Sequence, residues 1–334
     1  MRPRGGCAER PATDSVDKNA KIYVAGHRGL VGSALVRALE RHGYRNLLVR
    51  THAELELTDQ AATHRFFKTE RPDCVLLAAA KVGGIHANRT YPAEFIRQNL
   101  AIQDNVIHEA WRAGVRNLLF LGSSCIYPRD CPQPIREDYL LTGLLEETNR
   151  PNALAKIAGI ELCWSYNRQY GTRYLTAIPT SLYGPGDNYD LENSHVLPAL
   201  IRKMHEAKRD AREVVTLWGS GTPRREFLYS EDMAEACLHL LKFSEAHAPN
   251  LYSDRMPPLV NIGCGSDLTI ADLARVVADA VGFKGTFAFD PSKPDGTPRK
   301  LLDVSKIASF GWSPAVSLKQ GIANAYATYL EGNK

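Results

Sequence analysis

KIYVAGHRGLVG, residues 21–32, is the stretch that decides the fold class of this chain. Its first part, Lys21–Ala25, is a short apolar run of the kind that forms a strand covered on both faces. The rest places three glycines, Gly26, Gly29 and Gly32, before a segment with apolar residues at helical spacing, which stops at His42-Gly43. Those apolar residues are Leu30, Val31, Ala34, Leu35 and Leu39. A strand, a glycine turn and a helix in this order predict a dinucleotide site, because the glycines admit a pyrophosphate close to the free N–H groups of the helix N-terminus. A glycine turn without a ligand is the alternative.

Strand-like and helix-like segments alternate after this stretch. Asn46–Arg50, Cys74–Ala80 and Asn117–Gly122 are short and apolar, as buried strands are. Pro92–Ala113 has a broad apolar stripe at helical spacing, and a second long helix is expected over Asn152–Tyr170. The alternation predicts an α/β fold with a doubly wound parallel Rossmann sheet.

The second half of the chain has a different texture. From Tyr183-Gly184-Pro185 onward, polar loops separate a helix near Leu197–His205 from a strand at Val214–Trp218. We therefore expect an NADP-binding Rossmann domain over residues 21–184 and a smaller substrate-binding lobe built mainly from residues 185–334. Segments near residues 229–264, such as Val260–Gly263, are expected to return to the first sheet. Residues 1–20 lack the apolar region of a secretory signal, and we expect them to form a disordered leader.

The composition excludes several classes of protein. The 334 residues carry a net charge of +4, too weak and too dispersed for a nucleic-acid surface but suited to a pocket for an anionic metabolite. No apolar run reaches the length of a membrane span. The cysteines are scattered without C-x-x-C spacing, which argues against disulfides and zinc, so we expect a cytoplasmic protein with no metal site. They are Cys7, Cys74, Cys125, Cys131, Cys163, Cys237 and Cys264.

The end of the second predicted strand favours NADP(H) over NAD(H). NAD-binding folds usually place an acid there to hold the ribose hydroxyls. This strand instead ends Val49-Arg50-Thr51-His52, with no carboxylate. Arg28 and Arg50 are cations that suit a 2′-phosphate, although Arg50 could equally be a solvated strand-end charge.

Two later segments lie where a reaction centre is expected. Gly122-Ser123-Ser124-Cys125-Ile126-Tyr127-Pro128 follows the fourth strand, and open α/β sheets bind ligands beyond the carboxyl ends of their strands. Pro151-Asn152-Ala153-Leu154-Ala155-Lys156 begins a long helix, and Asn152 and Lys156 share one of its faces because they are one turn apart.

These motifs resemble those of the GDP-L-fucose synthases, a branch of the extended short-chain dehydrogenase/reductase family, and the resemblance runs from about residue 20 to the C-terminus. Further motifs carry it. They are Ala78-Ala79-Ala80-Lys81-Val82-Gly83-Gly84-Ile85, Ala155-Lys156-Ile157-Ala158-Gly159, Asn193-Ser194-His195-Val196, Trp218-Gly219-Ser220-Gly221-Thr222-Pro223 and Pro294-Asp295-Gly296-Thr297-Pro298-Arg299-Lys300.

The resemblance implies epimerisation at C3 and C5 of GDP-4-keto-6-deoxy-D-mannose, followed by NADPH-dependent reduction of the C4 ketone to give GDP-L-fucose. A 4-ketone acidifies the C–H bonds at C3 and C5, and inversion needs one group to remove a proton and another to return it. By similarity, Cys125 and His195 are that pair, with Cys125 as the base. Taken singly, a cysteine at a strand end is usually a packing residue, and a histidine after Asn-Ser is usually a surface or capping residue.

Position 152 departs from the family pattern. The family places a tyrosine four residues before the lysine to protonate the C4 oxygen, and a serine to bind that oxygen. Ser123 and Lys156 match, but residue 152 is asparagine, which cannot deliver a proton at neutral pH. Three explanations are open: a substitution in an otherwise ordinary enzyme, replacement of the acid by water or by a hydroxyl such as that of Tyr127, or loss of the reductive step.

The resemblance also assigns the remaining site residues. The cofactor contacts are Gly26, His27, Arg28, Gly29, Leu30, Val31, Gly32, Arg50, His52, Leu121, Gly122, Ser123, Ser124, Lys156, Pro179, Thr180, Ser181, Leu182 and His195. The substrate contacts are Lys203, Trp218, Arg225, Asp295 and Lys300, of which Asp295 also fits a simple turn. Relatives pair the two long helices into a homodimer, and we expect the same here. Two alternative functions are a related sugar-nucleotide epimerase or dehydratase with tightly held NAD, and a catalytically impaired NADP-binding dimer partner.

Overall fold

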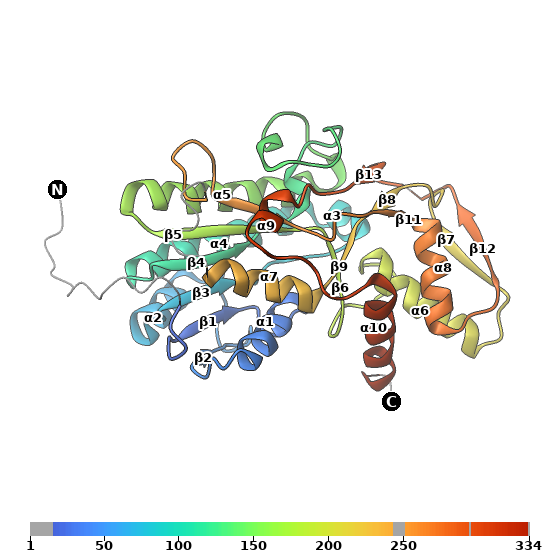
Figure 1. Cartoon of the computed structure of the whole chain (residues 1–334), viewed down its shortest axis with the longest axis horizontal. Helices are drawn as coiled ribbons and strands as arrows, with labels where there is room; N and C mark the ends of the chain where they lie inside the picture. The colour runs from blue at the N-terminus through green and yellow to red at the C-terminus, as the bar shows by residue number, and fades with distance from the viewer. Residues whose placement is uncertain (1–15, 243–250, 294, 333–334) are drawn as a thin grey trace, which may run out of the picture.

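A parallel six-stranded sheet runs through the larger part of the molecule, at the left of Figure 1, in the order β10-β5-β4-β3-β1-β2. The computed structural model describes residues 16–242, 251–293 and 295–332. The strands of this sheet are β1 (Ile22–Ala25), β2 (Leu47–Leu48), β3 (Cys74–Leu77), β4 (Asn117–Leu121), β5 (Arg173–Pro179) and β10 (Leu259–Ile262). The predicted α/β class with a doubly wound parallel sheet is confirmed.

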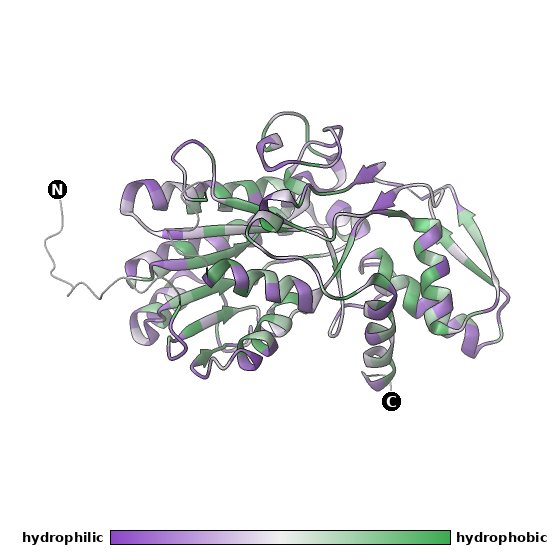
Figure 2. Ribbon diagram, viewed as in Figure 1, coloured by the Kyte–Doolittle hydropathy of each residue, from purple (hydrophilic) through white to green (hydrophobic). Residues whose placement is uncertain are grey.

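Strand β1 shows how the sequence builds a sheet covered on both faces. Because side chains alternate along a strand, Ile22 and Val24 pack into one core, and Tyr23 and Ala25 pack into another. Helices α1 (Leu30–Arg41) and α7 (Ser230–Lys242) complete the first core. Helices α2 (Gln60–Glu70), α4 (Pro92–Arg112) and α5 (Arg150–Tyr170) complete the second. Figure 2 shows the hydrophobic residues gathered along these central strands.

The second lobe has a core of its own, at the right of Figure 1. Helices α6 (Val196–Arg209) and α8 (Ile270–Val281) share this core with the paired strands β7 (Val214–Trp218) and β12 (Thr286–Asp290), and α10 (Leu318–Gly332) packs against α8. Two small sheets connect the lobes. One has β11 (Leu268–Thr269), β8 (Arg224–Arg225) and β13 (Arg299–Lys300), and the other pairs β6 (Ser181–Tyr183) with β9 (Phe227–Tyr229). Short helices are α3 (Ile85–Thr90), α9 (Ser305–Ser309) and the 3₁₀ turns Ser124–Ile126, Glu137–Tyr139 and Glu147–Asn149.

Strand β10 lies in the central sheet beside β5. Strands β6 and β9 pair across the expected boundary at residue 184, which stays a prediction. The predicted strand Asn46–Arg50 is shorter in the structure, where only Leu47–Leu48 is paired. Helix α6 extends beyond its predicted end at His205 and finishes at Arg209.

The expectation of a disordered leader over residues 1–20 is wrong for its last part. Val16 and Ala20 pack against the first core, and the Lys18 ammonium donates a 2.6 Å hydrogen bond to the carbonyl oxygen of His42. Residues 1–15 lie outside the described part of the chain. Among the helices that the structure describes, none has both the length and the apolar character needed to cross a bilayer.

Candidate active site

In the glycine loop after β1, Gly26 and Gly32 have no room for a Cβ atom. A Cβ atom on Gly32 would lie 2.0 Å from the carbonyl oxygen of Gly26. Gly26 itself has a φ of +83°, and a Cβ there would lie 2.7 Å from the backbone nitrogen of Ala79. Gly29 caps α1 without a side-chain hydrogen bond, and the first turn of α1 contains no acid. These features suit a bound pyrophosphate, because no side chain occupies the N–H groups at the N-terminus of α1, which is the positive end of the helix dipole.

The basic residues predicted to contact the cofactor differ in whether they already have a partner in the protein. The His27 Nδ1 atom is buried without a protein partner, and Arg28 is exposed. The Arg50 guanidinium already donates to Glu70 Oε1 at 2.7 Å, and His52 pairs with a carboxylate oxygen of Glu56 at 2.6 Å. Arg28 is therefore the cation of this set that is ready for a 2′-phosphate, whereas Arg50 must leave Glu70 to reach one.

The end of β4 holds a buried lysine. The Lys156 ammonium donates a 2.7 Å hydrogen bond to the carbonyl oxygen of Leu121 and lies over the ring of Phe120. Burial lowers its pKa to about 8, although the charge of Cys125 acts in the opposite direction. Gly122 fits closely, since a Cβ there would lie 2.3 Å from Ile178 Cδ1. Ser123 then begins the 3₁₀ turn that contains Ser124 and Cys125.

Asn152 contacts the predicted base directly. Its Nδ2 donates to the Cys125 Sγ at 3.6 Å, and its Oδ1 accepts from Asn99 Nδ2 at 2.9 Å. The backbone of Lys81 holds Asn99 in turn, through a 2.7 Å and a 3.0 Å hydrogen bond. The sequence interpretation missed Asn99. The available signal was a polar residue within the apolar stripe of the predicted helix, where the structure leaves it 2% exposed.

Tyr127 does not supply the missing acid. Its hydroxyl donates a 2.6 Å hydrogen bond to Asn261 Oδ1 inside the core, and only 3% of the residue is exposed. Burial raises the pKa of this phenol well above its ordinary value. The sequence suggestion that Tyr127 replaces the acid is therefore wrong.

The backbone of the Asn193-Ser194 turn positions His195. The Gly84 N–H donates to the carbonyl oxygen of Asn193 at 2.9 Å, and a Cβ on Gly84 would lie 2.5 Å from the Ser194 oxygen. His195 stands at the N-cap of α6 but makes no capping hydrogen bond. Its imidazole is thus not used to cap the helix.

Lys300 links the predicted thiol and imidazole. Its pKa is lowered by burial, while the charge of Cys125 acts to raise it. The pKa of His195 is lowered by the surrounding protein and, second, by the charge of Lys300, although the residue is exposed to solvent. The backbone of residues 81–84 connects the two groups: Lys81 binds Asn99, which holds Asn152 beside Cys125, and Gly84 binds the Asn193 carbonyl just before His195.

The predicted substrate residues lie on the lobe side of this region. Within the described residues, the Arg225 guanidinium donates to the carbonyl oxygens of Arg224 and Asp295, at 2.8 Å and 3.4 Å, and to no carboxylate. The Asp295 carboxylate accepts from the N–H and hydroxyl of Ser220, at 2.7 Å and 2.8 Å. The Asp295 side chain therefore holds the turn at Ser220, and its contact with the substrate stays a prediction.

Trp218 is 43% exposed, and two lysine side chains lie near its ring. The ammonium groups of Lys203 and Lys293 each lie 5.3 Å from the ring centroid. Lys203 also donates to the carbonyl oxygen of Thr216 at 3.1 Å. The sequence interpretation missed Lys293. An exposed aromatic ring beside two cations suits an anionic, ring-containing ligand.

The remaining predicted cofactor residues follow β5. Pro179 ends that strand, and the Thr180 N–H donates to the carbonyl oxygen of Ile262 at 3.0 Å. Ser181 and Leu182 continue into β6. Because β4 and β5 are parallel neighbours, these residues share the carboxyl edge with Gly122. Among the described residues, no three His, Cys, Asp or Glu side chains are grouped to hold a metal ion.

The arrangement predicts a titration. In the free protein we expect His195 to gain its proton below pH 6.5, the ordinary value for histidine, because the surroundings and the Lys300 charge disfavour the imidazolium. Replacing Lys300 by glutamine removes that charge and moves the midpoint upward. NMR titration of the histidine resonances, with His195→Asn to assign the signal, measures both midpoints. A midpoint above 6.5 contradicts the arrangement.

Comparison with known proteins identifies the relatives of the chain. Residues 22–263 match the NAD dependent epimerase/dehydratase family. The chain is 56% identical over 317 residues to GDP-L-fucose synthase 1 of Arabidopsis thaliana, covering 94% of each protein. It is 53% identical over 314 residues to the GDP-L-fucose synthase of Escherichia coli strain K12, covering 93% of this chain and 97% of that protein.

Solved structures show the same likeness. The GDP-6-OMe-4-keto-L-xylo-heptose reductase of C. jejuni superposes with a TM-score of 0.89 at 38% identity, covering 96% of this chain and 100% of that one. A GDP-L-fucose synthetase of Naegleria fowleri bound to NADP superposes with a TM-score of 0.84 at 26% identity, covering 96% of both chains.

Proposed function

The chain belongs to the NAD dependent epimerase/dehydratase family, and within it we propose that it acts as a GDP-L-fucose synthase. It converts GDP-4-keto-6-deoxy-D-mannose to GDP-L-fucose by epimerisation at C3 and C5 and NADPH-dependent reduction at C4. The observation that carries this proposal is the segment of residues 81–84, whose backbone contacts both Asn99, which holds Asn152 beside Cys125, and the Asn193 carbonyl just before His195.

Epimerisation follows from a thiol and an imidazole in one crevice. The Cys125 thiolate takes the proton from C3 or C5, and the electron pair of the broken C–H bond moves into the enolate of the 4-ketone. His195, in its imidazolium form, then donates a proton to the opposite face of that carbon, and proton exchange with solvent restores the thiolate and the imidazolium before the next inversion. The Asn152 amide, 3.6 Å from the sulfur, is placed to hydrogen-bond the thiolate.

Reduction uses the other half of the site. The glycine loop of residues 26–32 would hold NADPH, which would supply the hydride for C4. Ser123 is placed at the end of β4 to bind the C4 oxygen, and Lys156 lies one turn beyond Asn152. Since an amide does not release a proton at neutral pH, the C4 oxygen is protonated slowly, and reduction limits the overall rate.

The diphosphate of the substrate suits Arg225 and Lys300. Burial lowers the pKa of Arg225, which favours pairing of its charge with an anion. Trp218, with Lys203 and Lys293, forms an exposed ring surface beside them that suits the nucleotide or the sugar.

Product stereochemistry tests the proposal. Incubation of the purified chain with GDP-4-keto-6-deoxymannose in deuterated buffer, with and without NADPH, is followed by NMR. We expect deuterium to enter C3 and C5 in both samples. GDP-L-fucose forms only in the sample that contains NADPH, and it forms slowly. Cofactor retained through purification, with turnover that consumes no NADPH, supports instead an epimerase with tightly held NAD. The absence of both exchange and turnover supports a catalytically impaired NADP-binding protein, an alternative for which Asn152 is the only support.

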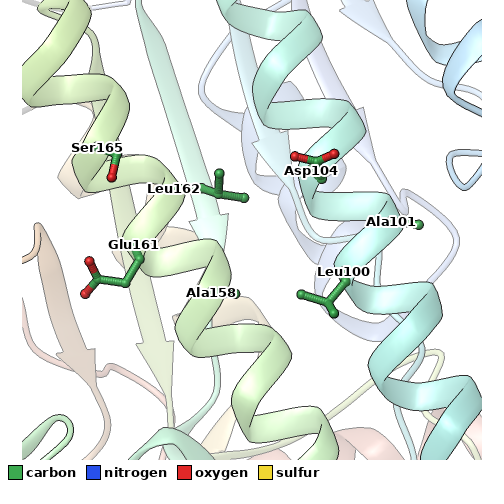
Figure 3. A pocket seen from close by; sticks show the side chains of 7 residues that line it. All are labelled: Leu100, Ala101, Asp104, Ala158, Glu161, Leu162 and Ser165. Atoms are coloured by element: carbon green, nitrogen blue, oxygen red, sulfur yellow. The ribbon is translucent and has the colours of Figure 1, made fainter.

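The homodimer remains a proposal, supported by the outer surface of α4 and α5. Figure 3 shows a groove between these helices, lined by small and apolar side chains with two acids at its sides. Its lining residues are Leu100, Ala101, Asp104, Ala158, Glu161, Leu162 and Ser165. Leu100 and Leu154 are 37% and 41% exposed on the same two helices. Burial against a second copy removes this apolar surface from water.

Placing a charge in this groove is expected to separate the protomers. In Ala158→Arg, a guanidinium has to be desolvated within the interface, so the mass measured by light scattering falls by half at the same protein concentration. Met256→Arg, at an exposed apolar residue on a loop, serves as the control and leaves the mass unchanged. Equal masses for wild type and Ala158→Arg contradict the proposed interface.

A cytoplasmic location is likewise a proposal. All six cysteines that the structure describes are free, as expected for a protein kept in a reducing compartment.

A further inference from the structure

Two short parallel strands carry four adjacent cations. In β8 and β13, Arg224 pairs with Arg299, and Arg225 pairs with Lys300. Because successive side chains of a strand point to opposite faces, Arg224 and Arg299 lie on one face, and Arg225 and Lys300 lie on the other. Like charges directly across a strand pair repel, so this arrangement needs a compensating acid.

Asp267, just before β11, compensates the first face only. Its Oδ1 accepts from Arg224 Nε and Nη2, at 2.9 Å and 2.7 Å, and its Oδ2 accepts from Arg299 Nε at 2.5 Å. The Arg224 Nη2 also donates to the Asp267 carbonyl oxygen at 2.9 Å. The Asp267 side chain is 4% exposed, whereas the two arginines are 42% and 44% exposed.

The opposite face has no acid bound to its cations. Within the described residues, neither Arg225 nor Lys300 forms an ion pair; the Glu146 carboxylate acts on both charges at longer range, and the charge of Arg225 contributes to lowering the pKa of Lys300. Glu226, the residue after Arg225, lies in the core and holds the neighbouring segments in place through its carboxylate. It is fully buried, and its carboxylate accepts from the N–H groups of Gly265 and Leu302, at 2.7 Å and 3.0 Å.

We propose that Asp267 is a positioning residue for the diphosphate of the substrate. By binding Arg224 and Arg299, it holds β8 beside β13, and so sets the distance between Arg225 and Lys300 on the other face. Asp267 touches no substrate, and its effect passes through the strand pair. The inference rests on the proposed function, because that function supplies the diphosphate.

Binding of GDP tests the proposal without the reaction. Isothermal calorimetry on the full chain is expected to show about tenfold weaker GDP binding for Asp267→Asn, because an amide cannot hold two guanidinium groups by charge. NADPH binding stays unchanged. Asp210→Asn is the matched control, since Asp210 also accepts from two arginines on this lobe, at 2.7 Å from Arg209 and 3.4 Å from Arg212. It leaves both affinities unchanged.

A double-mutant cycle separates positioning from general damage. If Asp267 acts through the basic pair, Asp267→Asn weakens GDP binding much less when Lys300 is already glutamine. Arg299→Gln is a milder change because it leaves Asp267 paired with Arg224, and it is expected to weaken GDP binding about threefold. It tests the proposal if Asp267→Asn does not fold.

Three outcomes overturn the proposal. Unchanged GDP affinity in both Asp267→Asn and Arg299→Gln contradicts it alone, as does an equal loss of GDP and NADPH binding. A wild-type chain that binds NADPH but no GDP contradicts the proposed function and this inference together.

Discussion

Replacing Asn152 by tyrosine raises the rate of C4 reduction by about 10²–10⁴-fold, the usual contribution of a positioned general acid. The new phenol stands one turn from Lys156, whose charge makes it a stronger acid. Because burial lowers the pKa of Lys156 to about 8, this assistance is present at pH 7 and declines as the pH rises through 8. Single-turnover oxidation of NADPH with the keto sugar measures the gain at pH 7 and pH 9.

Gln169→Tyr is the control for this change. It adds a phenol to an exposed position at the other end of the same helix, and leaves reduction unchanged. A wild-type chain that reduces rapidly and gains nothing from Asn152→Tyr contradicts the argument, because the proton then comes from another group.

Replacing Cys125 by serine slows deuterium uptake at C3 and C5 by about 10²–10⁴-fold, since a serine hydroxyl, unlike a thiol, is not ionised near neutral pH and supplies no anionic base. His195→Asn gives a loss of the same order, because the proton returned to the opposite face has no donor. Both are measured by NMR without NADPH, so the reductive step does not enter.

Cys131→Ser is the control for the thiol substitution. Cys131 is half-buried on the same segment, and burial raises its pKa, so its removal leaves exchange intact. Exchange at the wild-type rate in either Cys125→Ser or His195→Asn removes that residue from the mechanism.

Much of the central sheet could be predicted because its signals are local. The alternation of Ile22 and Val24 with Tyr23, and the three glycines after them, lie within twelve residues of sequence. Strand β5 was not predicted, although its partner β4 was. Strands β8, β11 and β13 have two residues each, too few to show any periodicity, so the connection between the lobes could not be read from the pattern.

The site was predictable where a residue follows a strand end or matches a family motif. Lys156 and Ser123 are of this kind. Residues that act on other side chains across long sequence separations could not be found in this way. Asn99 reaches Asn152 across 53 residues, and Asp267 reaches Arg224 across 43. Only the folded chain brings such partners together, and no local pattern specifies which polar residue meets which.

The course of the chain through the two lobes limits how the enzyme can be recombined with its relatives. After β5 the chain leaves the sheet, returns through β9, α7 and β10, and leaves again. A chimera joined once near residue 184 therefore also takes from its donor the helix that covers α1 and the strand that borders β5. Exchange of substrate preference needs two separate grafts, residues 185–226 and 263–332, with the intervening stretch kept from the recipient.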